Sequence, residues 1–141
     1  MIRHKPLPQN IAELLPEAFE YLRSEECIIF AYLFGSLVAG KARPLSDVDI
    51  ALYLSREVSF SEKKLDILGK LVDILKTDEI DLVVLNKAPL TLKMKILENN
   101  KVIVDKVPFL RHRYESLTMR EYFDFSFKET SILTKRFLHG R

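Results

Sequence analysis

The sequence has little of several features that define other protein classes. It contains a single cysteine, Cys27, so no internal disulfide can form. Four glycines and six prolines lie between periodic segments, so we find no low-complexity tract, internal repeat or flexible linker. No apolar run approaches the roughly 20 residues that cross a bilayer, and none follows the first residues as a signal sequence would. We therefore expect a soluble, cytoplasmic protein with no membrane association.

The charge is nearly balanced. There are 22 basic and 20 acidic residues, which give a formal net charge of +2. This balance lacks the basic excess typical of nucleic-acid-binding proteins, so direct nucleic-acid binding is not expected. With 141 residues, 48% of them hydrophobic, the chain can bury one ordinary core and is too short for two. Residues 1–141 are therefore predicted to form a single domain.

The hydrophobic pattern predicts alternating helices and strands. Helices are expected at about 10–24, from 36, 59–76, 89–98 and after Pro108, and strands at 28–34, 47–54, 80–85 and 101–105. Asn10 with Glu13 and Ser59 with Glu62 resemble capping boxes, and Pro16 predicts a kink or restart in the first helix. The order indicates an α/β or α+β fold, with a small mixed sheet of about four strands and helices packed on it.

Two aspartates at the start of a predicted strand carry the chemistry. Asp47 and Asp49 lie two residues apart, so their carboxylates share one face with Cα atoms about 6.6 Å apart. Like charges this close repel unless cations lie with them, and carboxylate oxygens are the ligands that Mg²⁺ prefers. Asp81, on the next strand, would complete a site for two Mg²⁺ ions, or Mn²⁺. Each aspartate alone could instead be a cap or a solvated strand end.

A glycine-serine step ends the first predicted strand. Gly35 lets the backbone approach a ligand closely, and the Ser36 hydroxyl and the free N–H groups of a following helix suit phosphate oxygens. As an isolated dipeptide, Gly-Ser is usually a plain turn.

A P-loop is the competing interpretation of this segment. Gly35 to Lys41 matches the first seven positions of that motif. Ala42, however, stands where a P-loop needs the Ser or Thr hydroxyl that holds Mg²⁺, which argues against it. Lys41 and Arg43 are either loop cations that reach a triphosphate or solvated residues without a role.

Spacing connects the two motifs. Ten residues, Leu37 to Ser46, separate Gly35-Ser36 from Asp47-Val48-Asp49, and this arrangement resembles the signature of the DNA polymerase β nucleotidyltransferase superfamily. The resemblance covers about residues 28–84. It implies a nucleotidyltransferase fold in which the Gly-Ser turn holds the triphosphate of ATP and the two aspartates bind both metal ions. The later carboxylate of that superfamily is matched here by Asp81.

The short length and the context of residues 39–50 are similar to minimal nucleotidyltransferases, the antitoxin half of HEPT–MNT toxin–antitoxin pairs. This resemblance implies transfer of AMP from ATP to a tyrosine hydroxyl of the partner RNase toxin, in a hetero-oligomer with that toxin. Two alternatives remain open: an adenylyltransferase acting on a small molecule or RNA, and a non-catalytic antitoxin that acts by steric binding.

The C-terminal segment adds weak support for a protein partner. We divide the chain into a catalytic core at about 28–105 and a helical docking segment at about 108–138. That segment is rich in large apolar side chains, namely Tyr114, Leu117, Tyr122, Phe123, Phe125, Phe127, Ile132, Leu133 and Phe137. One stripe of a helix cannot bury all of them, so some should face a partner, although they could instead cover the chain's own sheet. Arg111, His112 and Arg113 are expected to form a solvated basic turn.

Overall fold

The protein is described by a computed structural model, which covers residues 11–39 and 47–138, with side chains for residues 11–38 and 47–130. The elements are α1 (Ile11–Ser24), β1 (Ile28–Phe34), α2 (Ser36–Ala39), β2 (Val48–Leu54), α3 (Phe60–Leu75), β3 (Ile80–Val84), the 3-10 helix η1 (Leu85–Lys87), α4 (Leu90–Glu98), β4 (Asn100–Asp105) and α5 (Pro108–Leu138). The four strands form one mixed sheet in the order β3-β2-β1-β4. Only the β2–β3 pair is parallel in it. The predicted fold class is confirmed.

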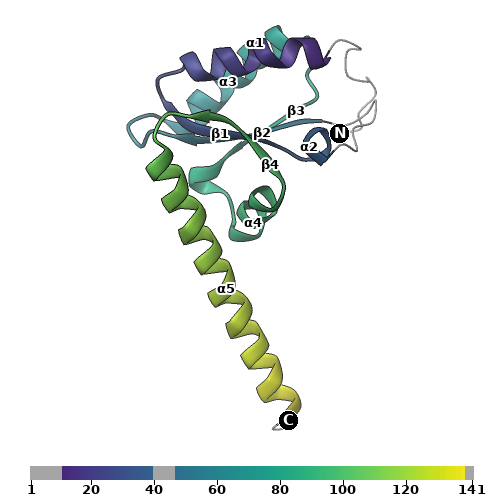
Figure 1. The fold of residues 1–141 in the computed structure, drawn as a ribbon, viewed down its shortest axis with the longest axis vertical. Coiled ribbons are helices and arrows are strands. Elements are labelled where there is room, and N and C mark those ends of the chain that lie inside the picture. Colours follow the sequence, from purple (N-terminus) through teal and green to yellow (C-terminus); the bar gives the residue numbers. More distant parts are fainter. Residues whose placement is uncertain (1–10, 40–46, 139–141) are drawn as a thin grey trace.

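Helices α1 and α3 cover one face of the sheet (Figure 1). Helix α1 buries Ala18 and Leu22, and α3 buries Ile67, Leu71 and Leu75, which recur every fourth residue on one side of the helix. They pack on the alternating side chains of β2 that point to this face: Val48, Ile50, Leu52 and Leu54. Each fully buried Leu or Ile contributes about 1.5–3 kcal/mol of transfer free energy, so this layer is a main source of stability.

The other face carries a second, more aromatic cluster. Its buried members are Phe30, Tyr32, Phe34, Ala51, Leu85 and Ile96. Helix α4 supplies Ile96, and the first turns of α5 supply the partly buried Leu110 and Tyr114 that pack against this cluster. The side chains of Asp49, Ala51 and Tyr53 point to this face, because alternate residues of β2 point the same way.

Polar contacts fix the first turns of α5 to the sheet. The Tyr32 hydroxyl donates a hydrogen bond of 2.6 Å to Glu115. Arg111 pairs with the same carboxylate at 3.1 Å and with Asp105 at 3.0 Å. The prediction of a solvated basic turn was therefore wrong for Arg111, whose side chain is only 15% exposed. Asp105 and Glu115, which are brought to it from β4 and α5, explain the difference.

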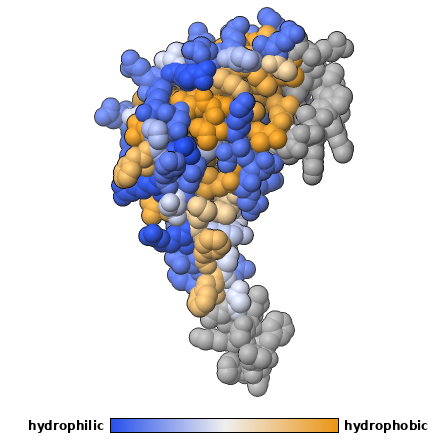
Figure 2. Space-filling model, viewed as in Figure 1, coloured by the Kyte–Doolittle hydropathy of each residue, from blue (hydrophilic) through white to orange (hydrophobic). Residues whose placement is uncertain are grey.

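Beyond its first turns, α5 projects away from the body of the molecule (Figure 1). Several large apolar side chains of α5 are exposed, and Figure 2 shows apolar surface along the projecting helix. They are Phe109, Leu117, Met119, Phe123, Phe125 and Phe127. Within the described ranges, no helix has the length and apolar character needed to span a membrane.

Most predicted element boundaries are close to those observed, with informative exceptions. Helix α1 continues through Pro16 rather than restarting there. Ser59 precedes α3 as expected, but its side chain makes no capping hydrogen bond. The alternation of polar and apolar residues in β2 is typical of a half-buried strand, yet Ala51 on the second face is fully buried, in a cluster with Leu85 and Ile96. Asn10, of the first capping pattern, lies outside the described residues.

Candidate active site

The sheet register brings the predicted aspartates to one place. Asp49 of β2 is paired with Asp81 of β3 in the parallel ladder, and with Phe34 of β1 in the antiparallel ladder. Asp47 lies just before β2 and two residues from Asp49, so it shares the same face. Asp49 and Asp81, 32 positions apart in the sequence, thus become neighbours, because a parallel β2–β3 pair aligns the same ends of both strands.

The three carboxylates form one cluster. An oxygen from each of Asp47, Asp49 and Asp81 lies within 4.8 Å of the others. Asp47 and Asp49 are partly buried and Asp81 is exposed, so one side of the cluster opens to solvent. Three negative charges this close repel each other, and a bound cation removes that repulsion. The donors are all carboxylate oxygens, a set that fits a hard ion such as Mg²⁺ rather than a thiolate- or imidazole-seeking metal.

Gly35 lies directly against this cluster. Its backbone has a φ of +79°, a conformation that glycine adopts without steric cost. A Cβ atom at this position would lie 2.9 Å from Cγ of Asp49 and still closer to its Oδ2. The chain therefore needs glycine here twice: for the turn that ends β1, and for room beside the Asp49 carboxylate.

Ser36 begins α2 immediately after this turn. The first N–H groups of any helix lack partners within the helix, so they are available to acceptors such as phosphate oxygens. The turn is held beside the carboxylates because Phe34, the last residue of β1, is paired with Asp49. The structure thus places Gly35 and Ser36 next to the acidic cluster. Lys41 and Arg43, the predicted loop cations, lie outside the described residues.

Two polar residues that the sequence analysis did not single out lie just before β3. Thr77 and Glu79 are both buried. The Thr77 hydroxyl accepts a hydrogen bond from the Glu79 N–H at 3.1 Å, and the Glu79 carbonyl accepts one from the Val48 N–H at 3.0 Å. These bonds extend the β2–β3 ladder up to the acidic cluster. The only sequence signal was the alternation Glu79-Ile80-Asp81, which does not distinguish a buried glutamate from a solvated one.

Comparison with known proteins gives a family and a fold. The family described as polymerase beta nucleotidyltransferase matches residues 17–108, which is more than half of the chain and includes all the candidate site residues. At the level of sequence, no curated protein matches the chain.

Several solved structures share the fold. One, a toxin–antitoxin with AMP-PNP, has a TM-score of 0.65 and 21% identity, over 89% of this chain and 94% of that one. Another, a tri-AMPylated Shewanella oneidensis HEPN toxin in complex with MNT antitoxin, has a TM-score of 0.60 and 20% identity, over 89% and 92%. A third, the toxin–antitoxin MntA-HepT, has a TM-score of 0.62 and 19% identity, over 91% and 97%. At these identities the likeness establishes the fold alone.

Proposed function

This chain belongs to the polymerase β nucleotidyltransferase family, and we propose that it transfers AMP from ATP to a tyrosine hydroxyl of a HEPT-type RNase toxin, neutralising that toxin. The observation that carries the reaction class is the cluster of Asp47, Asp49 and Asp81, whose carboxylate oxygens lie within 4.8 Å of one another. A glycine turn against Asp49 supplies the phosphate side of the same site.

The roles follow from this arrangement. Asp47, Asp49 and Asp81 would hold two Mg²⁺ ions. When bound, these ions supply neutralisation of the triphosphate charge and lower the pKa of an attacking hydroxyl. The Ser36 hydroxyl and the N–H groups of the turn would orient the β- and γ-phosphates. The acceptor oxygen then forms a bond to the α-phosphorus, the bond to pyrophosphate breaks, and the hydroxyl proton is released to solvent. Most of the rate gain comes from positioning and charge neutralisation.

A protein acceptor is supported by the shape of the molecule. Helix α5 projects from the body and exposes Phe123 and Phe127, at 64% and 76% of their surface. Exposed aromatic side chains in such number are typical of surfaces that bind another protein. The solved structures that share the fold include toxin–antitoxin complexes, one of them with an AMPylated toxin, which supports the same choice of partner.

The proposal is tested by incubating the protein with the product of a neighbouring toxin gene, ATP labelled at the α-phosphate, and Mg²⁺. We expect label on the toxin, on a tyrosine identified by mass spectrometry, and none when EDTA replaces Mg²⁺. RNase activity of the toxin should fall in step with labelling. If the toxin is inhibited without acquiring label, the protein is a steric antitoxin. If a small molecule or RNA is labelled instead, the assigned acceptor is wrong.

A further inference from the structure

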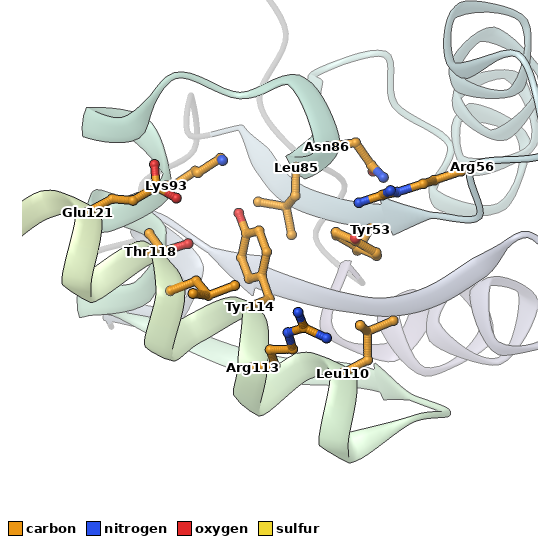
Figure 3. Close-up of a pocket in the computed structure, with 11 residues that line it drawn as sticks. Tyr53, Arg56, Leu85, Asn86, Lys93, Leu110, Arg113, Tyr114, Thr118 and Glu121 are labelled. Carbon is orange, nitrogen blue, oxygen red and sulfur yellow. The ribbon is translucent and has the colours of Figure 1, made fainter.

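A second site lies at the opposite end of β2 from the acidic cluster. It is a pocket of about 460 Å³ between the end of β2, η1, α4 and the first turns of α5 (Figure 3). Tyr53 and Tyr114 provide its aromatic surface, and Arg56, Lys93 and Arg113 provide its charge. A volume of this size is in the range of small-molecule sites, which run from roughly 300 to 1,000 Å³.

The aromatic surface is held rigidly. The Tyr53 ring stacks on Phe30, with ring centroids 4.6 Å apart and an interplanar angle of 8°. Tyr114 packs against both rings, at 5.5 Å from each. Neighbours on two strands and one helix therefore fix both tyrosines, so a flat ligand would meet a preformed surface without ordering these side chains.

The cationic side chains of the pocket form no salt bridge with any other described residue. Within the described part of the chain, Arg56 and Arg113 make no salt bridge, whereas Arg111 on the same helix makes two. Lys93 lies over the Tyr114 ring, 5.7 Å from its centroid. Of the residues that the structure describes, Glu121 alone contributes a carboxylate to the lining. Three cations against one carboxylate leave an excess of hydrogen-bond donors, which an anionic ligand would satisfy.

Two further polar groups line the pocket. The Tyr114 hydroxyl is buried beside Thr118 and, among the described residues, makes no hydrogen bond. The amide of Asn86 is partly used, because its oxygen accepts from the Leu54 N–H and its nitrogen donates to the Leu54 carbonyl, both at 2.9 Å. A buried hydroxyl without a partner costs free energy, which a ligand that supplies an acceptor would recover.

We propose that this pocket binds a nucleotide, with its phosphate on Arg56 and Arg113 and its base against Tyr53 and Tyr114. It is separate from the acidic cluster. Tyr53 lies four residues beyond Asp49, or about 13 Å along the strand. Between them Ala51 is fully buried in a cluster with Leu85 and Ile96, and none of the three aspartates lines the pocket. The Glu121 carboxylate, an acceptor in the pocket lining, suits an amino group on the base.

The test uses the ¹⁵N-labelled full chain in EDTA, where metal-dependent binding of a nucleotide at the aspartates is suppressed. AMP, adenosine and inorganic phosphate are titrated separately and followed by amide chemical shifts. AMP should shift the amides of Tyr53, Asn86 and the 113–121 segment and leave those of Gly35 and Ser36 unmoved. Adenosine and phosphate should each bind at least about tenfold more weakly, since either alone loses half of the contacts.

Matched variants separate this pocket from general charge effects. Arg113→Glu should weaken the binding of AMP at least about tenfold, as expected for loss of a charged hydrogen bond. Arg120→Glu makes the same charge change at an exposed position of α5 outside the pocket and should leave AMP binding unchanged. Asp49→Asn should also leave it unchanged. Shifts confined to Gly35 and Ser36, equal losses in both arginine variants, or phosphate binding as tightly as AMP would each overturn the proposal.

Discussion

The two ends of β2 have opposite characters, although they belong to one strand and to the same face of the sheet. At the first end Asp49 joins two other carboxylates within 4.8 Å and is open to solvent on the Asp81 side. At the other end Tyr53 is stacked on Phe30 and packed against Tyr114 of α5. The first end carries mutual repulsion that a ligand can relieve, and the second carries packing that stabilises the fold without one.

The difference teaches how function and stability are divided along the strand. The acidic end is built from residues between 35 and 81, and its clustered carboxylates are suited to holding a cation. The aromatic end joins β2 to α5, some sixty residues later, and the Tyr32–Glu115–Arg111–Asp105 contacts hold that helix in place. Changes at the acidic end should therefore affect transfer, and changes around the aromatic end should affect stability.

The largest expected effect is at the acidic end. Asp49→Asn should lower the rate of AMP transfer more than about 100-fold, because loss of a metal ligand should exceed the 10–100-fold cost of losing an outer-shell partner. Asparagine has the same size and shape as aspartate, so the variant should remain folded, which urea unfolding checks. Asp73→Asn, on an exposed position of α3, is the matched control and should transfer AMP normally. Equal activity of the two variants would show that the acidic cluster is not the catalytic site.

Gly35→Ala should lower both stability and AMP transfer, because this residue serves both the turn and the site. Its φ of +79° is strained for alanine, and the added Cβ would press on the Asp49 carboxylate. We expect a loss of about 1–3 kcal/mol in the free energy of unfolding, together with a large fall in transfer. Gly69→Ala, where a Cβ meets nothing within 4 Å, is the control and should lose neither. Normal transfer by the Gly35 variant would contradict the close contact.

Tyr32→Phe should lower stability without lowering AMP transfer. It removes the 2.6 Å hydrogen bond to Glu115, which still pairs with Arg111, so we expect a loss of about 1–2 kcal/mol in urea unfolding. AMP transfer, measured at urea concentrations well below the unfolding midpoint of the variant, should be retained, because the Tyr32 hydroxyl contacts Glu115 of α5 and not the acidic cluster. A loss of transfer in the still-folded variant would mean that the two regions are coupled.

The same tyrosine should also affect the stability at alkaline pH. Burial, and then its bond to Glu115, raise the pKa of Tyr32 above its ordinary value of 10.0. Because the pKa of Tyr32 is higher in the folded than in the unfolded chain, the unfolded chain loses this proton first as the pH rises. The contribution of Tyr32 to the free energy of unfolding is therefore complete below pH 10 and decreases above it. Between pH 10 and 11 the wild-type free energy of unfolding should therefore fall more steeply than that of Tyr32→Phe, by up to about 1.4 kcal/mol per pH unit. Parallel slopes would contradict this.

The smallest effect on stability is expected on the projecting part of α5. Phe127 is 76% exposed, so Phe127→Ser should change the free energy of unfolding by less than about 0.5 kcal/mol. If this surface binds the toxin, the variant should bind it more weakly in calorimetry while keeping its fold. Ser126→Ala, the neighbouring position, serves as control. A large destabilisation by Phe127→Ser would mean that the side chain packs within the protein itself.

Much of the fold was predictable because its signals are local. The apolar run of β1 and the fourth-residue spacing in α3 each predict an element within one or two residues of its observed bounds. Local patterns failed where packing by a distant element decided the outcome. The alternating pattern of β2 is typical of a half-buried strand, and Ala51 itself gives no sign that Leu85 and Ile96 join its cluster. Arg111 looked solvated because its partners, Asp105 and Glu115, are recognisable only once β4 and α5 are placed.

The sequence by itself determined the reaction class, because the Gly35-Ser36 step and the spacing to Asp47 and Asp49 are short-range features that chain geometry keeps together. It also named Asp81, though only as a candidate. The tertiary structure alone decided that Asp81 pairs with Asp49, since strand register is set by the packing of both sheet faces. It also decided where α5 meets the sheet, and hence the pocket between Tyr53 and Tyr114, because contacts between distant segments depend on the whole folded chain rather than on any local pattern.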